Sequence, residues 1–309
     1  MKLWTLLAEA LRVHGRAALV TVITVKGSAP REKGAAMIVN SGGFHGTIGG
    51  GTLEWQAIAR AQGLLAGPAA QRISVQSLGP DLGQCCGGQV EIATEIFTAR
   101  QLAQVEDWAA REQQGRFSLS RTIAGRLVEL EYGEDPRTVI VFGAGHVGRA
   151  LVMALAPLPF RVVWVDPRPG AFPAAIPRNA QALNGEDPLS ALPNVPDGTL
   201  AFIMSHSHAL DLVVTDAALR HPAIAEVGLI GSATKRARFE HRLRAAGVPD
   251  ERVSGLICPI GVVGIPSKLP AAIAAATAAQ ILVIDARLRL VMEAAKPQET
   301  QMSARGALR

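Results

Sequence analysis

The sequence predicts an α/β protein with an N-terminal α+β domain, followed by a C-terminal Rossmann-like domain built on a doubly wound parallel sheet. Its 309 residues are enough for two ordinary domains. The first half mixes short strand patterns with glycine-rich turns, which is typical of a largely antiparallel sheet. The second half alternates short strands with helices, which is typical of a parallel sheet covered on both faces.

The composition excludes several classes of protein. Apolar residues make up 49% of the chain and charged residues 18%, so a large core is available and disorder is not expected. Three cysteines, two of them adjacent, cannot form a disulfide framework and predict a reducing compartment. The net charge of +5 favours an anionic ligand. Nucleic acid is not an expected partner, because the basic residues are scattered and aromatic residues are few.

Neither end of the chain predicts a membrane segment. Charged residues interrupt the apolar start, which is typical of an amphipathic helix leading into a strand rather than of a signal peptide. The alanine-rich run at 269–284 is shorter than the roughly 20 residues needed to span a bilayer, and it predicts a buried helix. The polar segment 296–309 predicts a flexible tail. We therefore expect a cytoplasmic protein that does not bind membranes.

The N-terminal domain is expected to span residues 1–132. Strands are predicted where short apolar runs lie between turn residues, at 18–25, 35–40, 73–77, 90–97, 117–122 and 127–132. Helices are predicted at 52–66 and 101–114, where apolar residues recur at helical spacing. A polar, turn-rich linker is expected at 133–137.

The Rossmann-like domain is expected to span residues 138–295. Its predicted strands are 138–142, 161–165, 200–205 and 227–231. Its predicted helices are 147–155, 211–220 and 235–246.

Residues 143–148 match the pattern G-x-G-x-x-G between a predicted strand and a predicted helix. Gly143, Gly145 and Gly148 would allow a tight turn, close approach to a phosphate, and packing of the helix on the strand. Asp166, at the end of the next strand, could accept a hydrogen bond from a ribose hydroxyl. The pattern favours a Rossmann-like fold, but NAD(P), another phosphorylated molecule or no ligand at all remain open.

A second glycine-rich segment precedes the predicted helix 52–66. Gly49, Gly50 and Gly51 lie directly before this helix. The arrangement favours an anion at the helix N-terminus, because backbone amides point toward such a ligand. A tight turn capped by Thr52 is the alternative interpretation.

The N-terminal domain contains two more candidate segments. The turn at 27–31 carries the hydroxyl of Ser28 and the guanidinium of Arg31, and a bare turn with a solvated arginine is the alternative. Cys85 and Cys86 lie in a long glycine-rich loop. This suits a soft metal or a sulfur-transfer step, because the thiolate is the reactive form. The spacing is not that of a zinc site, and buried, inert cysteines are the alternative.

A pair of histidines follows the predicted strand 200–205. His206 and His208, with Asp211 nearby, would therefore lie at the carboxyl edge of the sheet, where open α/β folds bind ligands. They could bind a metal or an anion or transfer protons, and a loop without function is the alternative. Cys258 is expected to serve in packing.

In this order, the segments resemble the xanthine dehydrogenase accessory proteins of the XdhC/CoxI family. The matching segments are 27–31, 49–54, 86–88, 141–148, 205–208 with Asp211, and 230–232. The resemblance covers residues 1–290. It implies a small N-terminal domain and a C-terminal Rossmann domain. It also implies a carrier of molybdenum cofactor (Mo-molybdopterin), which is sulfurated by a cysteine desulfurase and then delivered to the molybdenum subunit of apo-xanthine dehydrogenase.

Cofactor binding is expected at residues from every matched segment, and Cys86 is the candidate molybdenum contact. The set is Ser28, Arg31, Gly49, Gly50, Gly51, Cys86, Gly87, Gly88, Gly143, Gly145, His146, Gly148, Asp166, His206, His208 and Asp211. Two positions depart from the family pattern. Thr52 replaces a cysteine found in relatives on the carbon-monoxide-dehydrogenase side, and Ala271 replaces a glutamate after Pro270. No catalytic residue is expected.

The leading hypothesis is a non-catalytic cofactor chaperone. The main alternative is an NAD(P)-dependent oxidoreductase that uses the 143–148 fingerprint with Asp166, and His206 or His208 as general acid–base. The Rossmann domain could bind the pterin phosphate, NAD(P) or another nucleotide, or only protein. A homodimer is expected, and the identity of the client enzyme rests on the family resemblance.

Overall fold

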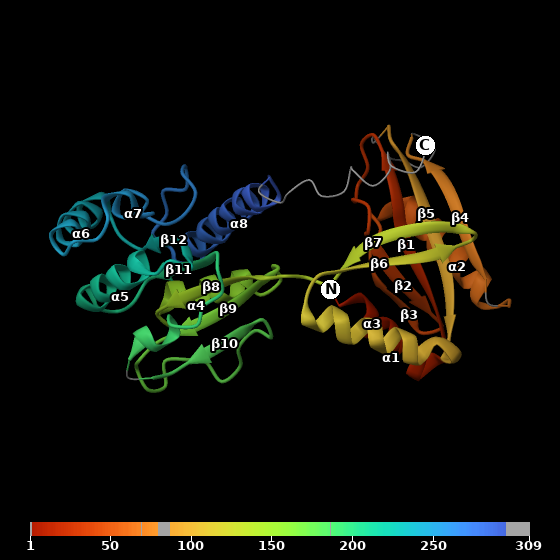
Figure 1. Cartoon of the computed structure of the whole chain (residues 1–309), viewed down its shortest axis with the longest axis horizontal. Helices are drawn as coiled ribbons and strands as arrows, with labels where there is room; N and C mark the ends of the chain where they lie inside the picture. The colour runs from red at the N-terminus through yellow and green to blue at the C-terminus, as the bar shows by residue number, and fades with distance from the viewer. Residues whose placement is uncertain (1, 69, 80–86, 186, 295–309) are drawn as a thin grey trace, which may run out of the picture. The chain divides into compact units, whose positions relative to one another are not determined.

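The computed structural model describes residues 2–68, 70–79, 87–185 and 187–294, which form two compact units, Met1–Asp135 and Pro136–Arg309. Figure 1 shows the helices and strands of each unit. The predicted fold class is confirmed, because the first unit has an antiparallel sheet with helices and the second has a parallel sheet. The tail predicted at 296–309 lies outside the described residues, as do Cys85 and Cys86.

The first unit is built on a five-stranded antiparallel sheet with the strand order β3-β2-β1-β5-β4. Its elements are α1 (Leu3–His14), β1 (Arg16–Lys26), β2 (Ala36–Asn40), β3 (Gly43–Gly46), α2 (Gly51–Leu65), β4 (Gln71–Ser77), β5 (Gln89–Thr98), η2 (Ala99–Gln101), α3 (Leu102–Gln114), β6 (Phe117–Ile123) and β7 (Arg126–Tyr132). The hairpin of β6 and β7 forms a separate two-stranded sheet.

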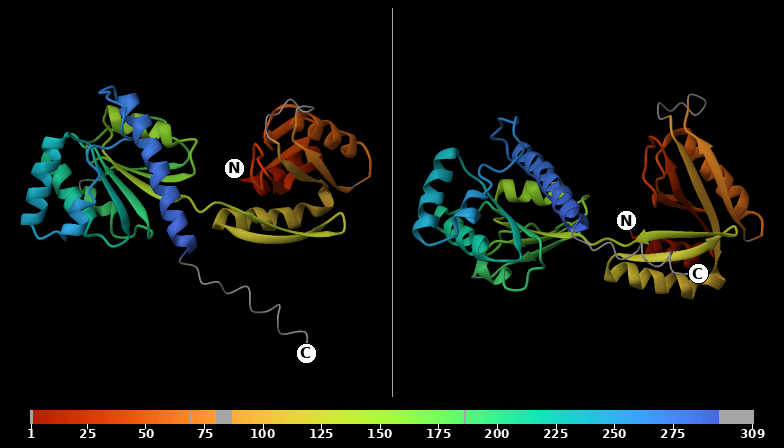
Figure 2. Two further views of the ribbon diagram at one scale, coloured as in Figure 1. Left: turned by 90° about the horizontal axis from the view of Figure 1, so that it is seen from above. Right: turned by 45° about the horizontal axis from the view of Figure 1, so that its top comes forward.

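Both faces of this sheet are covered, which explains the unbroken apolar run in β1. Leu19 belongs to the core that includes α1, α3 and the β6–β7 hairpin. Its neighbours Ala18 and Val20 belong to the core beneath α2. Successive side chains of a strand point to opposite faces, so both sets must be apolar. Figure 2 shows α3 and the hairpin on one side of the sheet and α2 on the other.

The second unit has a five-stranded sheet in the order β10-β9-β8-β11-β12, and every strand pair is parallel. Its elements are β8 (Arg137–Phe142), α4 (His146–Leu155), β9 (Phe160–Val165), β10 (Ala180–Leu183), η3 (Pro188–Ala191), β11 (Thr199–Ile203), α5 (His208–Arg220), β12 (Ile224–Leu229), α6 (Ala233–Ala245), α7 (Asp250–Ser254) and α8 (Pro270–Ala294). One core lies under α4 and α8, and the other under α5, α6 and α7.

The order of strands reverses between β8 and β11. The chain moves from β8 outward to β9 and β10, and then returns to the other side of β8 with β11 and β12. A doubly wound sheet binds ligands at such a reversal, outside the carboxyl ends of the strands. The fold therefore directs attention to the loops that follow β8, β9 and β11.

Helix α8 differs from its prediction. It extends to Ala294, and only one of its faces is buried: Ala278 and Ile281 pack in the core with α4, whereas Leu282, Val283 and Leu290 are exposed. By length and composition alone it is long and apolar enough to cross a membrane. This is weak evidence, because core helices of soluble proteins share these properties.

Candidate functional site

The glycine loop between β8 and α4 lies at the strand reversal, and two of its glycines are required by packing. A Cβ at Gly143 would lie 2.3 Å from the carbonyl oxygen of Met204, at the end of β11. A Cβ at Gly148 would lie 1.9 Å from the carbonyl oxygen of Gly143. A Cβ at Gly145 would meet no protein atom within 4 Å, so this position is open. Gly145 thus leaves room for a ligand to approach the backbone.

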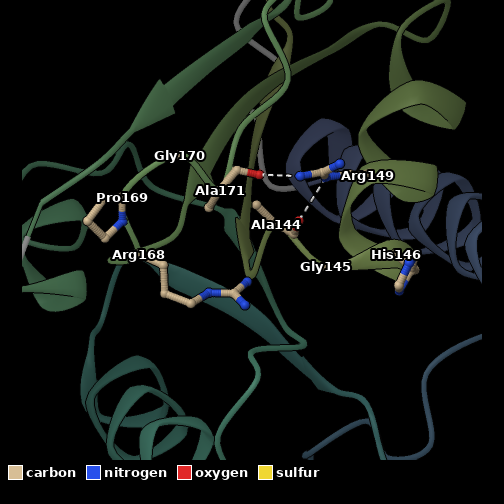
Figure 3. Close-up of a pocket in the computed structure, with 8 residues that line it drawn as sticks. All are labelled: Ala144, Gly145, His146, Arg149, Arg168, Pro169, Gly170 and Ala171. Carbon is tan, nitrogen blue, oxygen red and sulfur yellow. Dashed lines mark hydrogen bonds between the residues drawn. The ribbon is translucent and has the colours of Figure 1, made fainter.

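A pocket of about 380 Å³ opens beside this loop. Its lining residues come from the start of α4 and from the segment after β9, as Figure 3 shows: Ala144, Gly145, His146, Arg149, Arg168, Pro169, Gly170 and Ala171. Two arginines and the N-terminus of a helix therefore face one cavity. Such an arrangement favours a negatively charged ligand.

Arg149 is held in place by backbone carbonyl groups on both sides of the pocket. Its Nε donates to the carbonyl of Ala144 at 3.0 Å, and its Nη2 donates to the carbonyl of Ala171 at 2.7 Å, as Figure 3 shows. Among the described residues, none accepts a hydrogen bond from its Nη1. One end of the guanidinium is thus fixed and the other is available to a ligand.

Asp166 does not offer the free carboxylate that the sequence pattern predicts. Its Oδ1 accepts from the amide and Nε of Arg168, at 3.0 and 2.9 Å. Its Oδ2 accepts from the amide of Ala144 and from Nη2 of Arg168, both at 2.7 Å. A carboxylate has about four acceptor positions, and all are taken, so none remains for a ribose hydroxyl.

The same contacts set the charge of Asp166, whose side chain is only 1% exposed. Burial by itself raises the pKa of a carboxyl group. Hydrogen bonds from the Arg168 side chain and from the Ala144 and Arg168 amides outweigh burial and lower the pKa of Asp166 to about 2. Asp166 is therefore a permanent anion that fixes the glycine loop and Arg168 together.

The predicted cluster of His206, His208 and Asp211 is not a cluster of free metal ligands. Asp211 is buried, and its Oδ1 accepts from the amide and hydroxyl of Ser205, at 3.0 and 2.6 Å. Its Oδ2 accepts from Nζ of Lys235 at 2.7 Å. Both histidines are exposed. Across the part of the chain that the structure describes, no three His, Cys, Asp or Glu side chains could hold a metal ion together.

Lys235 is a residue that the sequence analysis missed. Besides Asp211, its ammonium group donates to the carbonyl of Ile230 at 2.8 Å, so it joins the starts of α5 and α6 to the end of β12. No local pattern marks this lysine, which lies 24 residues from its partner. The only available signal was that a buried aspartate requires a cationic partner.

Three predicted segments of the first unit meet at one end of its sheet. A Cβ at Gly49 would lie 2.7 Å from Cγ of Pro30, and a Cβ at Gly88 would lie 2.1 Å from the carbonyl oxygen of Ser28. The turn at 27–31 is thus in contact with the glycine loop and with Gly88. Arg31 is exposed beside them. Cys86, the candidate molybdenum contact, lies outside the described residues.

In the glycine loop of this unit, the amides of Ile48, Gly49 and Gly50 already donate to side chains of the chain itself. Glu54, in the first turn of α2, accepts from the amides of Ile48 and Gly50, at 3.0 and 3.3 Å, and from the hydroxyl of Thr47. The carboxylate thus takes the Ile48 and Gly50 amides that an anionic ligand at this loop would have used. Gly49, Gly50 and Gly51 all have positive φ angles, of 135°, 78° and 64°, which side chains rarely adopt. The loop is shaped to wrap Glu54.

The fold and the pocket together define a two-domain protein with a Rossmann-type domain and an arginine-lined pocket beside its glycine loop. Residues 139–281 match the family model of the XdhC Rossmann domain, and residues 10–76 match that of the XdhC and CoxI family. The chain belongs to this family. The family is associated with xanthine dehydrogenase maturation, and its members are accessory proteins.

Two further similarities agree with this assignment. The uncharacterized protein YqeB of Escherichia coli K12 is 27% identical over 291 residues, which are 92% of this chain and 47% of YqeB. The chain thus spans about half the length of that relative. A Bacillus halodurans crystal structure, described as a xanthine dehydrogenase, has a TM-score of 0.77 at 21% identity and covers 95% of this chain and 98% of that one. At this identity the likeness shows the fold alone.

Proposed function

We propose that this protein is a molybdenum cofactor chaperone, which holds the cofactor for sulfuration and delivers it to apo-xanthine dehydrogenase. The observation that carries the proposal is the arginine-lined pocket at the start of α4, in a chain of the XdhC family. Molybdopterin ends in a phosphate group, which is an anion of the kind that such a pocket favours.

The residues of the pocket fit this group. The lining contains two arginines and no carboxylate, and its volume lies in the range of small-molecule sites, roughly 300–1,000 Å³. Gly145 and His146 would offer amides at the start of α4, and Arg149 and Arg168 would offer guanidinium donors. When bound, the cofactor supplies the molybdenum centre that the client enzyme requires. The chain's own part is to hold the phosphate and to limit access of water.

We also propose Cys86, which lies outside the described residues, as the residue that contacts molybdenum. Gly88, the described residue two positions further along the chain, lies against Ser28. A cysteine thiolate is a suitable ligand for a soft metal. The proposed partners are a cysteine desulfurase and the molybdenum subunit of apo-xanthine dehydrogenase, in the cytoplasm, with the chaperone acting as a homodimer.

A transfer assay tests this function. The full chain is loaded with sulfurated molybdenum cofactor under anaerobic conditions and mixed with apo-xanthine dehydrogenase, and the appearance of xanthine oxidation is followed. We expect activation with the wild type and a marked loss with Cys86→Ala, whereas Cys258→Ala, at a buried cysteine of the second unit, is the control. No activation by the wild type would contradict the proposal.

An NAD(P)-dependent oxidoreductase is the second candidate. It is favoured by the glycine loop at the strand reversal, which has the arrangement of a dinucleotide site. The engagement of Asp166 by four hydrogen bonds counts against recognition of an NAD ribose. Reduction of NAD(P)⁺ by the purified chain with candidate substrates, and no cofactor transfer, would favour this alternative.

A further inference from the structure

We propose that Arg168, and not Asp166, is the specificity-determining residue of the α4 pocket, and that the pocket selects a phosphomonoester over a ribose diol. This inference rests on the proposed function, because it concerns the same pocket. It goes beyond that function by naming the chemical group that the pocket distinguishes.

The pocket is rich in hydrogen-bond donors and poor in free acceptors. The carboxylate of Asp166 is saturated, and the carbonyls of Ala144 and Ala171 already accept from Arg149. A ribose diol is recognised by an acceptor that takes both hydroxyl protons. A phosphate dianion offers only acceptors, so it complements a lining of this kind.

Arg168 is held in a fixed orientation. Its Nε and Nη2 form a two-point contact with Asp166, and its own amide donates to the same carboxylate. Pro167 and Pro169 on either side restrict the backbone. The side chain is nevertheless 41% exposed and lines the pocket. Within the described part of the chain, nothing accepts from its Nη1, so this donor is aligned in advance for a ligand.

The balance of charge favours a dianion. Asp166 and Arg168 neutralise each other, and none of the residues that line the pocket carries a carboxylate. Arg149 and the N-terminus of α4 then provide the net positive potential. Figure 3 shows both guanidinium groups beside Ala144, in the loop that leads into the helix. The shared chemistry is a terminal phosphate, which either a pterin phosphate or the 2′-phosphate of a nucleotide can supply.

Two matched pairs of probes test this inference. The first pair is the fluorescent, oxidised pterin phosphate prepared from molybdenum cofactor and the same pterin after phosphatase treatment. The second pair is NADP⁺ and NAD⁺. Binding to the full chain is measured by fluorescence anisotropy and by calorimetry. We expect the phosphorylated member of at least one pair to bind about tenfold or more tightly than its partner, since a charged hydrogen bond contributes about that factor.

Three variants test which residues cause the preference for the phosphorylated probe. Arg168→Ala should reduce the ratio of affinities within that pair to near one. Arg161→Ala should leave it unchanged, because Arg161 is exposed near the amino end of β9, at the opposite edge of the sheet. Asp166→Asn should lower the ratio without changing affinity for the unphosphorylated member, as expected of a residue that positions Arg168.

Each outcome decides the inference. A preference in the pterin pair supports it with a pterin source, and a preference in the nucleotide pair supports it with a nucleotide source. Equal affinities within both pairs, a ratio unchanged in Arg168→Ala, or no binding of any phosphate probe would overturn it. If the Arg168→Ala variant transfers cofactor as well as the wild type does, the chaperone function stands and this inference is rejected. If NADP⁺ binding depends on Arg168 but the wild type transfers no cofactor, this inference stands and the chaperone function is rejected.

Discussion

At the scale of single residues, the site is organised by two buried aspartates that the sequence presents as free ligands. Asp166 directly follows the apolar strand β9, Asp211 lies in the first turn of α5, and both are 1% exposed. Each is matched by a cation, Arg168 or Lys235, at 2.7 Å. A buried carboxylate must be paired in this way, because an unpaired one would cost several kcal/mol. Their roles are therefore to position neighbouring groups.

The depressed pKa of Asp166 predicts how stability depends on pH. The pKa is about 2 in the folded chain and lies below the ordinary value of 3.8. The stabilisation is therefore complete above about pH 4 and is lost as the pH falls toward 2. Asp166→Asn should lower the free energy of unfolding by about 2 kcal/mol at pH 7. Denaturant titrations of wild type and variant at several pH values measure this difference.

The difference between wild type and Asp166→Asn should shrink steadily between pH 4 and pH 2. Asp216→Asn is the matched control, because Asp216 pairs with Arg220 on the exposed surface of α5 and should affect stability little. A difference for Asp166→Asn that is the same at pH 7 and at pH 2 would refute the assigned charge state.

The Lys235–Asp211 pair gives a second prediction at this scale. Lys235→Met leaves Asp211 buried without its cation, and should lower the free energy of unfolding by about 3 kcal/mol. Lys235→Met combined with Asp211→Asn should recover most of the loss, since no charge then remains buried. Lys268→Met, at an exposed lysine, is the control. A double variant no more stable than Lys235→Met alone would show that the pair does not account for the loss.

At the scale of elements, the glycines of the loop before α4 have two different roles, one in packing and the other in ligand binding. Gly148 is enclosed by backbone, whereas Gly145 is open and has an ordinary φ of −74°. Gly145→Ala should therefore fold with an unchanged melting temperature and bind phosphate probes about tenfold more weakly, because its methyl group narrows the approach to the amides. Gly148→Ala should lower the melting temperature. Unchanged phosphate binding in a folded Gly145→Ala variant would exclude the loop as the binding element.

Elements with strong local patterns were predictable from the sequence, whereas short strands that form only by pairing with another strand were not. The strand β1 and the β8–loop–α4 segment follow from apolar runs and from the glycine spacing. The strand β3 was missed because Gly43 and Gly46 give it no strand pattern, and it forms by pairing with β2. The short strand β10 was missed in the same way, since it forms by pairing with β9.

The candidate site also has features that the sequence predicts and features that it does not. The loops that contain the site residues were located from the sequence, because strand ends and glycines mark them. Their hydrogen-bond partners were not, since Glu54 folds back on its own glycine loop and Asp166 binds Arg168 and Ala144. Whether a carboxylate is free or engaged depends on geometry that spacing alone does not contain.

At the scale of the whole molecule, the proposed function rests on family membership together with one arginine-lined pocket. The central claim is that the chain binds molybdenum cofactor through this pocket. The most direct measurement is equilibrium binding of molybdenum cofactor to the full chain under anaerobic, reducing conditions, for the wild type, Arg149→Ala and the control Arg161→Ala. The account predicts micromolar or tighter binding that Arg149→Ala weakens and Arg161→Ala does not. Absence of binding, or equal binding by all three proteins, would contradict it.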